Sequence, residues 1–398
     1  MKQSQSPLDA ETGGNAPSGS DDAALLLPPP GVEPLQQRAG GQYLGRLLRR
    51  DEVDRAIQLY REASFSQLTP KQWDWRFFGR NPRMGILPAV FHRDGRLIAI
   101  YPVTFRPVWI RGRELMAGQA CNTLVHPEFR GGGRVYLFLM KFTFDVFWSH
   151  GLHFGYGGGA TEEAMKVGAK LSTYRPLLEL TVRERRLSLR LALGRRFGEV
   201  GALGARVLDA SRRRTASRRH GGFELQTVAA AGPEFDELWR RKRGRYVVAV
   251  RRDARELDWR WFANPVPSQV IAARRDGRLE GYVVLRHHPD TGGPARLSTV
   301  IDLFSGQEPE VDAALLAAAA REAGDAGSDF LHFAPAPRSS AFPQVQAKPW
   351  RPARKEVDRV LVARCSYDPG QVGIQAEFDT VMDGANWYYC QGDSDFLD

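Results

Sequence analysis

The chain has 398 residues, of which 42% are hydrophobic, so it is long enough for two or three globular domains with ordinary cores. Its three cysteines, Cys121, Cys365 and Cys390, lie far apart, which excludes a disulfide scaffold and a structural zinc site and favours a reducing compartment. Of the net charge of +10, twelve arginines against three acidic residues place +9 in residues 183–220. The basic character therefore belongs to one segment.

The first 40 residues are rich in Gly, Pro, Ser and Asp, and we expect them to be disordered. They carry no secretion signal, because Leu25-Leu26-Leu27 is too short for a signal core. The longest apolar stretch, residues 135–148, has 14 residues and includes two charges, whereas a membrane span needs about 20 residues. We therefore expect a soluble, cytoplasmic protein with no integral membrane segment.

The next 140 residues predict a mixed α/β unit with Asp94-Gly95 as a hairpin turn. Helices are expected at 51–64, 135–150 and 161–168, an aromatic helix or turn at 73–78, and strands at 86–92, 97–104, 116–125, 152–156 and 177–182. A later part of the chain repeats this order, with helices at 235–240 and 310–323 and strands at 269–273, 279–286, 297–304 and 329–333.

Three landmarks of the first unit recur in the second at offsets of 184, 183 and 182 residues. They are Asp74-Trp75-Arg76-Phe77-Phe78 with Asp258-Trp259-Arg260-Trp261-Phe262, Asn81-Pro82 with Asn264-Pro265, and Arg93-Asp94-Gly95-Arg96-Leu97 with Arg275-Asp276-Gly277-Arg278-Leu279. A period this long indicates a duplicated domain rather than a solenoid repeat. Tryptophans such as Trp75 and Trp259 occur in both copies, which favours a structural role for them.

These patterns predict five parts. They are a disordered segment (1–40), an N-terminal domain (41–182), an arginine-rich amphipathic helical linker (183–222), a C-terminal domain (223–365) and a tail (366–398). Each domain is expected to hold a mixed, mostly antiparallel sheet flanked by helices. The aromatic cluster of the tail is expected to dock on the body of the protein, and its Asp393 and Asp395 are weak candidates for a metal site.

A glycine-rich loop distinguishes the first copy from the second. Strand residues Leu124 and Val125 lead into a turn, three glycines (131–133) follow, and a long helix begins. Glycines let successive backbone N–H groups point at one anion, and the helix N-terminus adds positive charge. Arg130 and Arg134 flank the loop and can pair with phosphate oxygens. A flexible turn is the simpler alternative, but the flanking strand, helix and arginines favour a pyrophosphate cradle.

Residues 125–135 resemble the signature V-x-P-x-x-R/Q-x-x-G-x-G/A of the GNAT acyltransferase superfamily. They match at Val125, Pro127, Arg130 and Gly133, and differ at Val135, where glycine or alanine is expected. The plan of the whole chain also resembles tandem GNAT proteins of bacteria.

The resemblance implies two tandem GNAT-like domains, with acetyl-CoA or another acyl-CoA as cosubstrate and no metal. It implies that the cofactor-binding residues are Leu124, Val125, Arg130, Gly131, Gly132, Gly133 and Arg134. The reaction is then transfer of an acyl group, most simply acetyl, to a primary amine such as an amino sugar or small metabolite, by direct attack in a ternary complex.

The family's general acid is often a tyrosine, in an element that residues 164–169 resemble with Ala164 at the tyrosine position. Tyr156 and Tyr174 are the nearby substitutes, and Glu128 is the candidate base. His126 and His153 are weaker candidates, better explained as a turn residue and a packed residue. Cys121 is better explained as a small buried side chain than as a nucleophile.

The second copy has no such loop, because residues 301–310 contain one glycine, no arginine and several carboxylates. Carboxylates at a helix N-terminus occupy the anion site themselves, so we expect a degenerate domain that does not bind coenzyme A. For residues 183–220, contact with an anionic surface stays open, whereas the shortage of aromatic residues argues against nucleic acid. The alternative functions are a non-catalytic binding or scaffold protein, which Ala164 and Val135 favour, and a Fem-like tRNA-dependent aminoacyl transferase.

Overall fold

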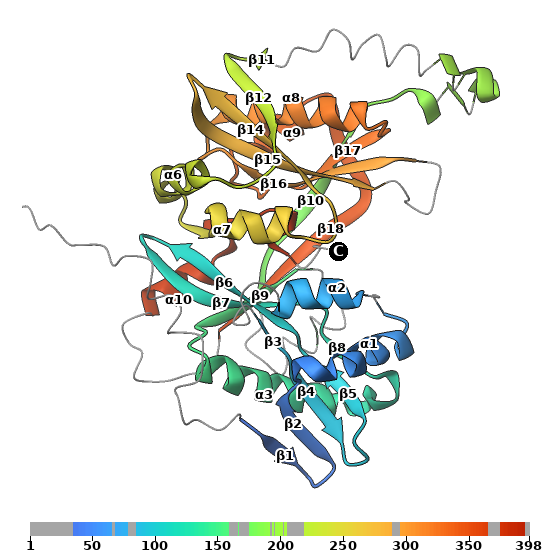
Figure 1. Ribbon diagram of the computed structural model, residues 1–398, viewed down its shortest axis with the longest axis vertical. Helices are drawn as coiled ribbons and strands as arrows, with labels where there is room; N and C mark the ends of the chain where they lie inside the picture. The colour runs from blue at the N-terminus through green and yellow to red at the C-terminus, as the bar shows by residue number, and fades with distance from the viewer. Residues whose placement is uncertain are drawn as a thin grey trace, which may run out of the picture.

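The chain forms two lobes, the N-terminal half in one and most of the C-terminal half in the other (Figure 1). This computed structural model describes residues 35–65, 68–78, 85–158, 166, 175–191, 193–194, 196–201, 203–204, 219–288, 295–364 and 375–394. The predicted landmark Asn81-Pro82 and all but Lys166 of the predicted helix 161–168 lie outside these ranges.

The N-terminal lobe is a mixed α+β unit, as the sequence predicts. Its strands are β1 (Gln37–Ala39), β2 (Tyr43–Leu47), β3 (Gly85–Ile86), β4 (Pro88–His92), β5 (Leu97–Ile100), β6 (Val103–Ile110), β7 (Arg113–Ala120), β8 (Leu124–Val125) and β9 (Phe154–Gly157). Its helices are η2 (Arg50–Glu52), α1 (Val53–Glu62), α2 (Pro70–Trp73), η3 (Asp74–Phe78), η4 (Pro127–Phe129), η5 (Gly131–Gly133) and α3 (Arg134–Ser149). The predicted hairpin at Asp94-Gly95 is confirmed, with Gly95 at φ 86° in the turn.

The rest of the chain adds a second set of strands and helices. The strands are β10 (Arg175–Arg186), β11 (Arg219–His220), β12 (Phe223–Val228), β13 (Val248–Val250), β14 (Gln269–Arg275), β15 (Arg278–His288), β16 (Leu297–Phe304), β17 (Phe330–Phe333), β18 (Trp350–Arg364) and β19 (Trp387–Tyr388). The helices are α6 (Pro233–Lys242), η6 (Arg243–Arg245), α7 (Ala254–Leu257), η7 (Asp258–Phe262), α8 (Pro309–Asp325), α9 (Phe342–Gln346), α10 (Gln375–Val381), η9 (Gly384–Asn386) and η10 (Gln391–Asp393).

One sheet continues through both lobes. Its strand order is β11-β12-β14-β15-β16-β17-β10-β18-β9-β7-β6-β13-β19, with β3 added beside β6, while β1-β2-β4-β5-β8 form a second sheet. Strand β18 lies between β10 and β9 and so joins the two halves. The predicted domain boundaries therefore stay a prediction, because no break in the sheet marks them.

Two segments differ from the sequence prediction, and a third agrees with it. Gln37–Ala39, predicted to be disordered, pairs with β2, whereas residues 1–34 lie outside the described part. Residues 183–186, placed in the linker, are the end of β10 and pair with β17, since Val182 continues into the same extended strand. The expected docking of the tail's aromatic cluster is confirmed, because β19 pairs in parallel with β13 and its aromatic side chains are buried.

Each half contains one parallel strand–helix–strand unit. In the first, β7 and β8 lead through α3 to β9, and β7 pairs in parallel with β9. In the second, β16 leads through α8 to β17, and these two strands also pair in parallel. A helix is the usual crossover between parallel neighbours, and its N-terminus lies beyond the carboxyl end of the first strand. The starts of α3 and α8 are therefore equivalent positions in the two units, where an anion could bind.

The repeated tryptophans meet each other across the two copies. The indole nitrogen of Trp75 donates to the carbonyl of Trp259 at 2.8 Å, and that of Trp259 donates to the carbonyl of Trp75 at 3.2 Å. Their rings stack with centroids 5.4 Å apart. A reciprocal contact between equivalent residues is the signature of a twofold arrangement, which agrees with the duplication read from the sequence.

Candidate functional site

The loop between β8 and α3 adopts a backbone that favours glycine. Gly132 and Gly133 have φ of 68° and 69°, and an added Cβ at Gly131, Gly132 or Gly133 would meet no atom within 4 Å. A right-handed residue followed by a left-handed one, as at Gly131 and Gly132, turns successive N–H groups toward a common concave side, the arrangement that binds anions. The N–H of Gly133 donates to the carbonyl of Arg130 at 3.4 Å, and the space beside the glycine Cα atoms is open.

Helix α3 begins directly after these glycines and strengthens the positive field. Its 16 residues carry no acidic side chain in the first turn, and Arg134 at the start is exposed. The first N–H groups of a helix have no partner within the helix, and the helix dipole makes this end positive. The start of α3 can thus accept a diphosphate without competition from the chain's own carboxylates.

Side-chain contacts hold the loop in place. The Nε of Arg130 donates to the carbonyl of Val125 at 2.9 Å, so this arginine bridges the loop back to the end of β8. The ring of Phe129 packs against His92 with centroids 5.5 Å apart. His126 accepts a hydrogen bond from the backbone of Glu128 through Nδ1 at 3.3 Å and caps the turn, as a turn residue should. These contacts hold the backbone of the loop in one conformation.

The equivalent position in the second copy is filled by the protein's own charges. Glu308 stands at the N-cap of α8, and Glu310 and Asp312 lie in its first turn. Lys242, which is 1% exposed, places Nζ 3.1 Å from a Glu308 carboxylate oxygen and donates to the carbonyl of Ser305 at 3.0 Å. A Cβ at Gly306 would overlap the Lys242 side chain. This helix start therefore already has its anion, and a lysine occupies the space beside it.

Tyr156 lies on β9 opposite Gln119 of β7, where the parallel pairing of these strands ends. Its side chain is 1% exposed and packs against the rings of Trp387 and Tyr389 from the tail. Its hydroxyl has no hydrogen-bond partner among the described residues. Burial raises the pKa of this phenol, so Tyr156 is protonated at neutral pH.

A buried charged cluster surrounds Tyr156 where the two copies meet. Arg106 of β6 lies 3.1 Å from the carboxylate of Glu256 on α7, and both side chains are nearly inaccessible to solvent. Its Nη1 also donates to Gln119, which in turn donates to the backbone carbonyl of Asp393 at 3.0 Å. This cluster was not predicted from the sequence. Its one local signal is Arg106, a lone arginine inside the apolar strand Val103–Ile110, because a charge in such a strand indicates a buried ion pair.

The remaining candidate catalytic and metal-binding residues are held in contacts with neighbouring groups or lie outside the described residues. Glu128 is 66% exposed and pairs with Arg96 at 3.4 Å, and Tyr174 lies outside the described residues. His153 is packed, its Nδ1 lies 3.4 Å from the carbonyl oxygen of Met116, and burial lowers its pKa. Cys121 is buried, forms no disulfide with the other described cysteine, and its thiol donates to the carbonyl of Gln119 at 3.4 Å. Asp393, a weak metal candidate, pairs with arginines instead, and Asp395 is not among the described residues.

Solved structures that this chain resembles include N-acetyltransferases and an N-myristoyltransferase. A GCN5-related N-acetyltransferase from Anabaena variabilis superposes with a TM-score of 0.58 at 10% identity, over 82% of this chain and 73% of that one. The chain has the GNAT fold. N-myristoyltransferase of Saccharomyces cerevisiae with bound myristoyl-CoA gives 0.54 at 11% identity, over 83% and 80%. A probable N-acyltransferase from Enterococcus faecalis gives 0.56 at 11%, over 81% and 72%. The sequence itself matches no protein-family model and no curated protein.

Two kinds of feature are absent from the described residues. None of their helices has the length and apolarity needed to cross a bilayer. They also contain no group of three or more His, Cys, Asp or Glu side chains arranged to hold a metal ion.

Proposed function

We propose that the N-terminal half binds an acyl-CoA and transfers its acyl group, most simply acetyl, to a primary amine of a small molecule. The observation that carries this proposal is the contrast between two equivalent helix starts. That of α3 offers paired left-handed glycines and no acidic side chain, whereas that of α8 holds Glu308 and Lys242. The GNAT fold, whose neighbours include an N-myristoyltransferase with bound myristoyl-CoA, supports the same assignment.

The diphosphate of the cosubstrate would bind the N–H groups of Gly131–Gly133 and the first turn of α3. Arg130 and Arg134 would add charge-assisted hydrogen bonds to its oxygens. Leu124 and Val125 form the edge strand that leads from this loop toward the end of the β7–β9 pairing. The extended arm of the cosubstrate would follow this edge, and the thioester would lie where the two strands part.

The acceptor would approach between the two copies, and because Tyr156 is 1% exposed, its hydroxyl would reach the thioester only after Trp387 and Tyr389 shift aside. In the reaction, the neutral amine attacks the thioester carbon, a carbon–nitrogen bond forms, the carbon–sulfur bond breaks, and the thiolate takes up a proton. Tyr156 is the proposed source of that proton, because it is protonated and its hydroxyl has no partner among the described residues. Glu128, at the exposed rim of the loop, remains the proposed base that takes up the proton of the acceptor amine.

The test of this function is release of free coenzyme A thiol from acetyl-CoA in the presence of a panel of primary amines, amino sugars included. We expect amine-dependent release, with the acetyl group recovered on the amine nitrogen. Tight acetyl-CoA binding without turnover on any amine would favour the scaffold alternative. Acyl transfer that requires aminoacyl-tRNA would instead assign the Fem-like reaction.

Replacement of Tyr156 by phenylalanine is expected to lower kcat at least about 100-fold, as loss of a general acid does, with the KM for acetyl-CoA unchanged. The matched control is Tyr389→Phe, which removes a second buried hydroxyl from the same aromatic cluster. Steady-state kinetics of both variants decide the point. Equal kcat losses in the two variants would contradict a chemical role for Tyr156.

A further inference from the structure

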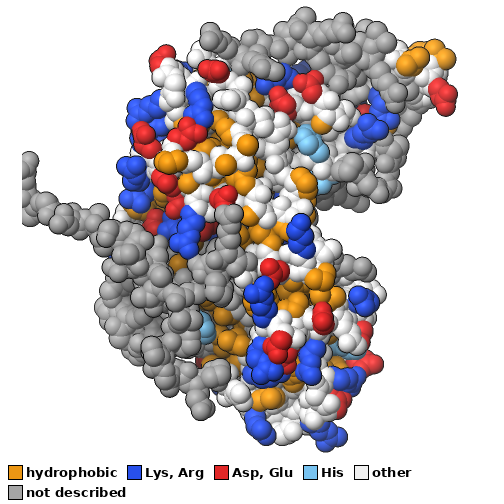
Figure 2. All heavy atoms as spheres, in the orientation of Figure 1, with side chains coloured by type: hydrophobic (Ala, Val, Ile, Leu, Met, Phe, Trp, Pro, Cys, Tyr) orange, Lys and Arg blue, Asp and Glu red, His pale blue; other side chains and the backbone are white. Residues whose placement is uncertain are grey.

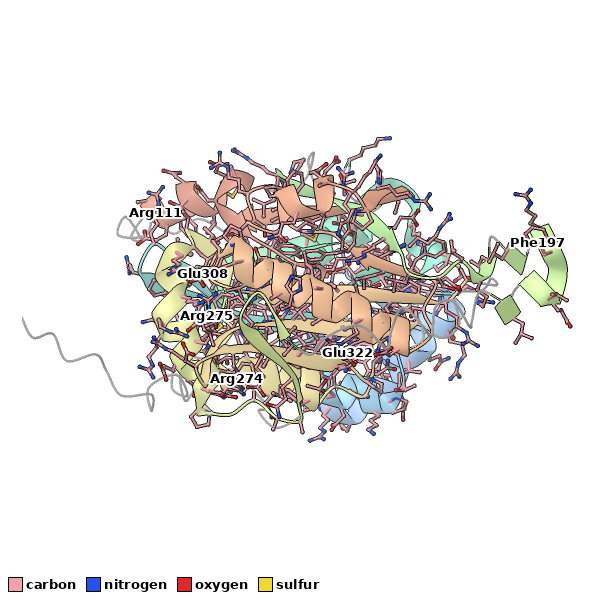
Figure 3. The ribbon with its side chains drawn as sticks, turned by 90° about the horizontal axis from the view of Figure 1, so that it is seen from above. Arg111, Phe197, Arg274, Arg275, Glu308 and Glu322 are labelled. Carbon is pink, nitrogen blue, oxygen red and sulfur yellow. The ribbon has the colours of Figure 1, made fainter. Side chains whose placement is uncertain are left out.

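The described residues between 190 and 204 form a short helical projection at the edge of the C-terminal lobe (Figure 1). Its described residues are helical on both sides of Gly198, whose φ of 62° interrupts the helix. A Cβ at Gly201 would overlap the carbonyl of Leu193, so the second part folds back closely on the first. Figure 3 shows Phe197 on this projection, well away from the two lobes.

The root of the projection is firmly attached to the C-terminal lobe. Arg190 binds the buried carboxylate of Asp329 with two hydrogen bonds, of 3.1 Å from Nε and 2.5 Å from Nη2. The backbone N–H of Leu187 donates to the carbonyl of Asp329 at 2.9 Å, and its side chain packs against the core of that lobe. The projection thus leaves the body from a fixed point.

The far end of the projection exposes apolar side chains. Phe197 is 57% exposed, Val200 81% and Leu203 61%. In the described chain the other exposed large hydrophobic side chains, Phe65 at 41% and Val247 at 37%, are less exposed and lie apart from each other in the sequence. Figure 2 shows hydrophobic side chains together at the end of this projection. Three neighbouring apolar side chains kept in water indicate a surface that binds something.

The charge of the surrounding segment specifies the partner. Beyond β10 and Arg190, which is bound to Asp329, residues 191–220 carry eight arginines against two acidic residues, a charge of +6. Apolar side chains flanked by arginines match an anionic lipid surface, where the apolar groups enter the headgroup region and the cations meet the lipid charge. A nucleic acid would use the cations but leave Val200 and Leu203 in water, and Phe197 alone offers a ring for base stacking.

We propose that this projection docks the protein on a membrane surface that contains anionic lipids. The proposal stands apart from acyl transfer, because the projection begins on the C-terminal lobe and the glycine loop lies in the N-terminal one. Such docking would hold the catalytic lobe near substrates at that surface.

The experiment is flotation of the full-length protein with vesicles of phosphatidylcholine containing about 30% phosphatidylserine, and with vesicles of phosphatidylcholine alone. We expect flotation with the anionic vesicles, a strong loss of it at high salt, and little flotation with the neutral ones. The triple variant Phe197→Ser, Val200→Ser, Leu203→Ser should lose at least about tenfold in partitioning, since each side chain loses apolar burial in the lipid.

The matched control is the double variant Phe65→Ser, Val247→Ser, which removes exposed apolar side chains elsewhere and should float like the wild type. Wild-type protein that does not float with anionic vesicles would overturn the proposal. A triple variant that floats as well as the wild type would also overturn it. Binding of duplex RNA by both the wild type and the triple variant, with no flotation, would point to a nucleic-acid partner instead. Acyl transfer in solution should be unchanged in the triple variant, so failure of docking and failure of the proposed activity remain distinguishable.

Discussion

Replacement of Gly132 by aspartate is expected to weaken acetyl-CoA binding at least about 100-fold. The substitution places a carboxylate beside the N–H groups that would hold the diphosphate, and like charges in contact repel strongly. It also forces a side chain into a left-handed backbone, which costs about 1–2 kcal/mol. Isothermal titration calorimetry of acetyl-CoA into the wild type and the variant measures the effect.

The control for this change is Gly277→Asp in the hairpin between β14 and β15. Gly277 has a φ of 77° and, like Gly132, no atom within 4 Å of an added Cβ, so the backbone strain is the same. This variant should bind acetyl-CoA as the wild type does. If both variants lose binding equally, strain rather than the anion site is responsible. If Gly132→Asp binds normally, the cradle assignment is wrong.

Replacement of Asp393 by alanine is expected to lower the free energy of unfolding by about 3–5 kcal/mol, the cost of leaving a buried charge without its partner. Its carboxylate is fully buried and pairs with Arg252 and, at 3.1 Å, with Arg260, and both arginines are also fully buried. Urea unfolding followed by tryptophan fluorescence measures the loss. The control is Asp325→Ala at an exposed position, which should change stability by about 0.5 kcal/mol or less.

The same cluster predicts a dependence on pH. Burial raises the pKa of Asp393, but Arg252 and Arg260 outweigh it and hold the pKa below the usual value. A carboxyl with a lowered folded-state pKa stabilises the fold fully above about pH 4, and this contribution is lost as the pH falls further. The difference in unfolding free energy between wild type and Asp393→Asn should therefore shrink below about pH 4. A difference that stays constant or grows on acidification would contradict the ion-pair account.

Much of the local structure followed from patterns within single segments. The helix at 135–150 and the strand at 297–304 correspond to α3 and β16, because long apolar periodicity and β-branched runs are local signals. The strand predicted at 116–125 is two strands, since Asn122 adopts φ 46° and breaks the pairing. No local signal revealed that β18 would enter the sheet between β10 and β9, since such pairing depends on residues far apart in the sequence.

In the candidate site, too, the contiguous motif was predicted from the sequence and the parts assembled from distant segments were not. The glycine loop is a contiguous motif, and its left-handed glycines, flanking strand and helix start agree with the sequence prediction. The cluster of Arg106, Glu256 and Asp393 is assembled from β6, α7 and the tail, and sequence spacing contains nothing that joins them. The charged pair of Glu308 and Lys242 that fills the start of α8 was predicted only in part. The carboxylates at the start of α8 were expected, whereas Lys242 comes from a different helix.

The most direct test of the central claim is hydrogen exchange of the backbone amides with and without acetyl-CoA. The two copies serve as each other's control in one sample. The account predicts slower exchange at residues 124–136, covering the end of β8, the glycine loop and the start of α3, and no change at residues 305–312 around the start of α8. Protection at 305–312, or none at 124–136 under saturating acetyl-CoA, would contradict the assignment of acyl-CoA binding to the N-terminal copy.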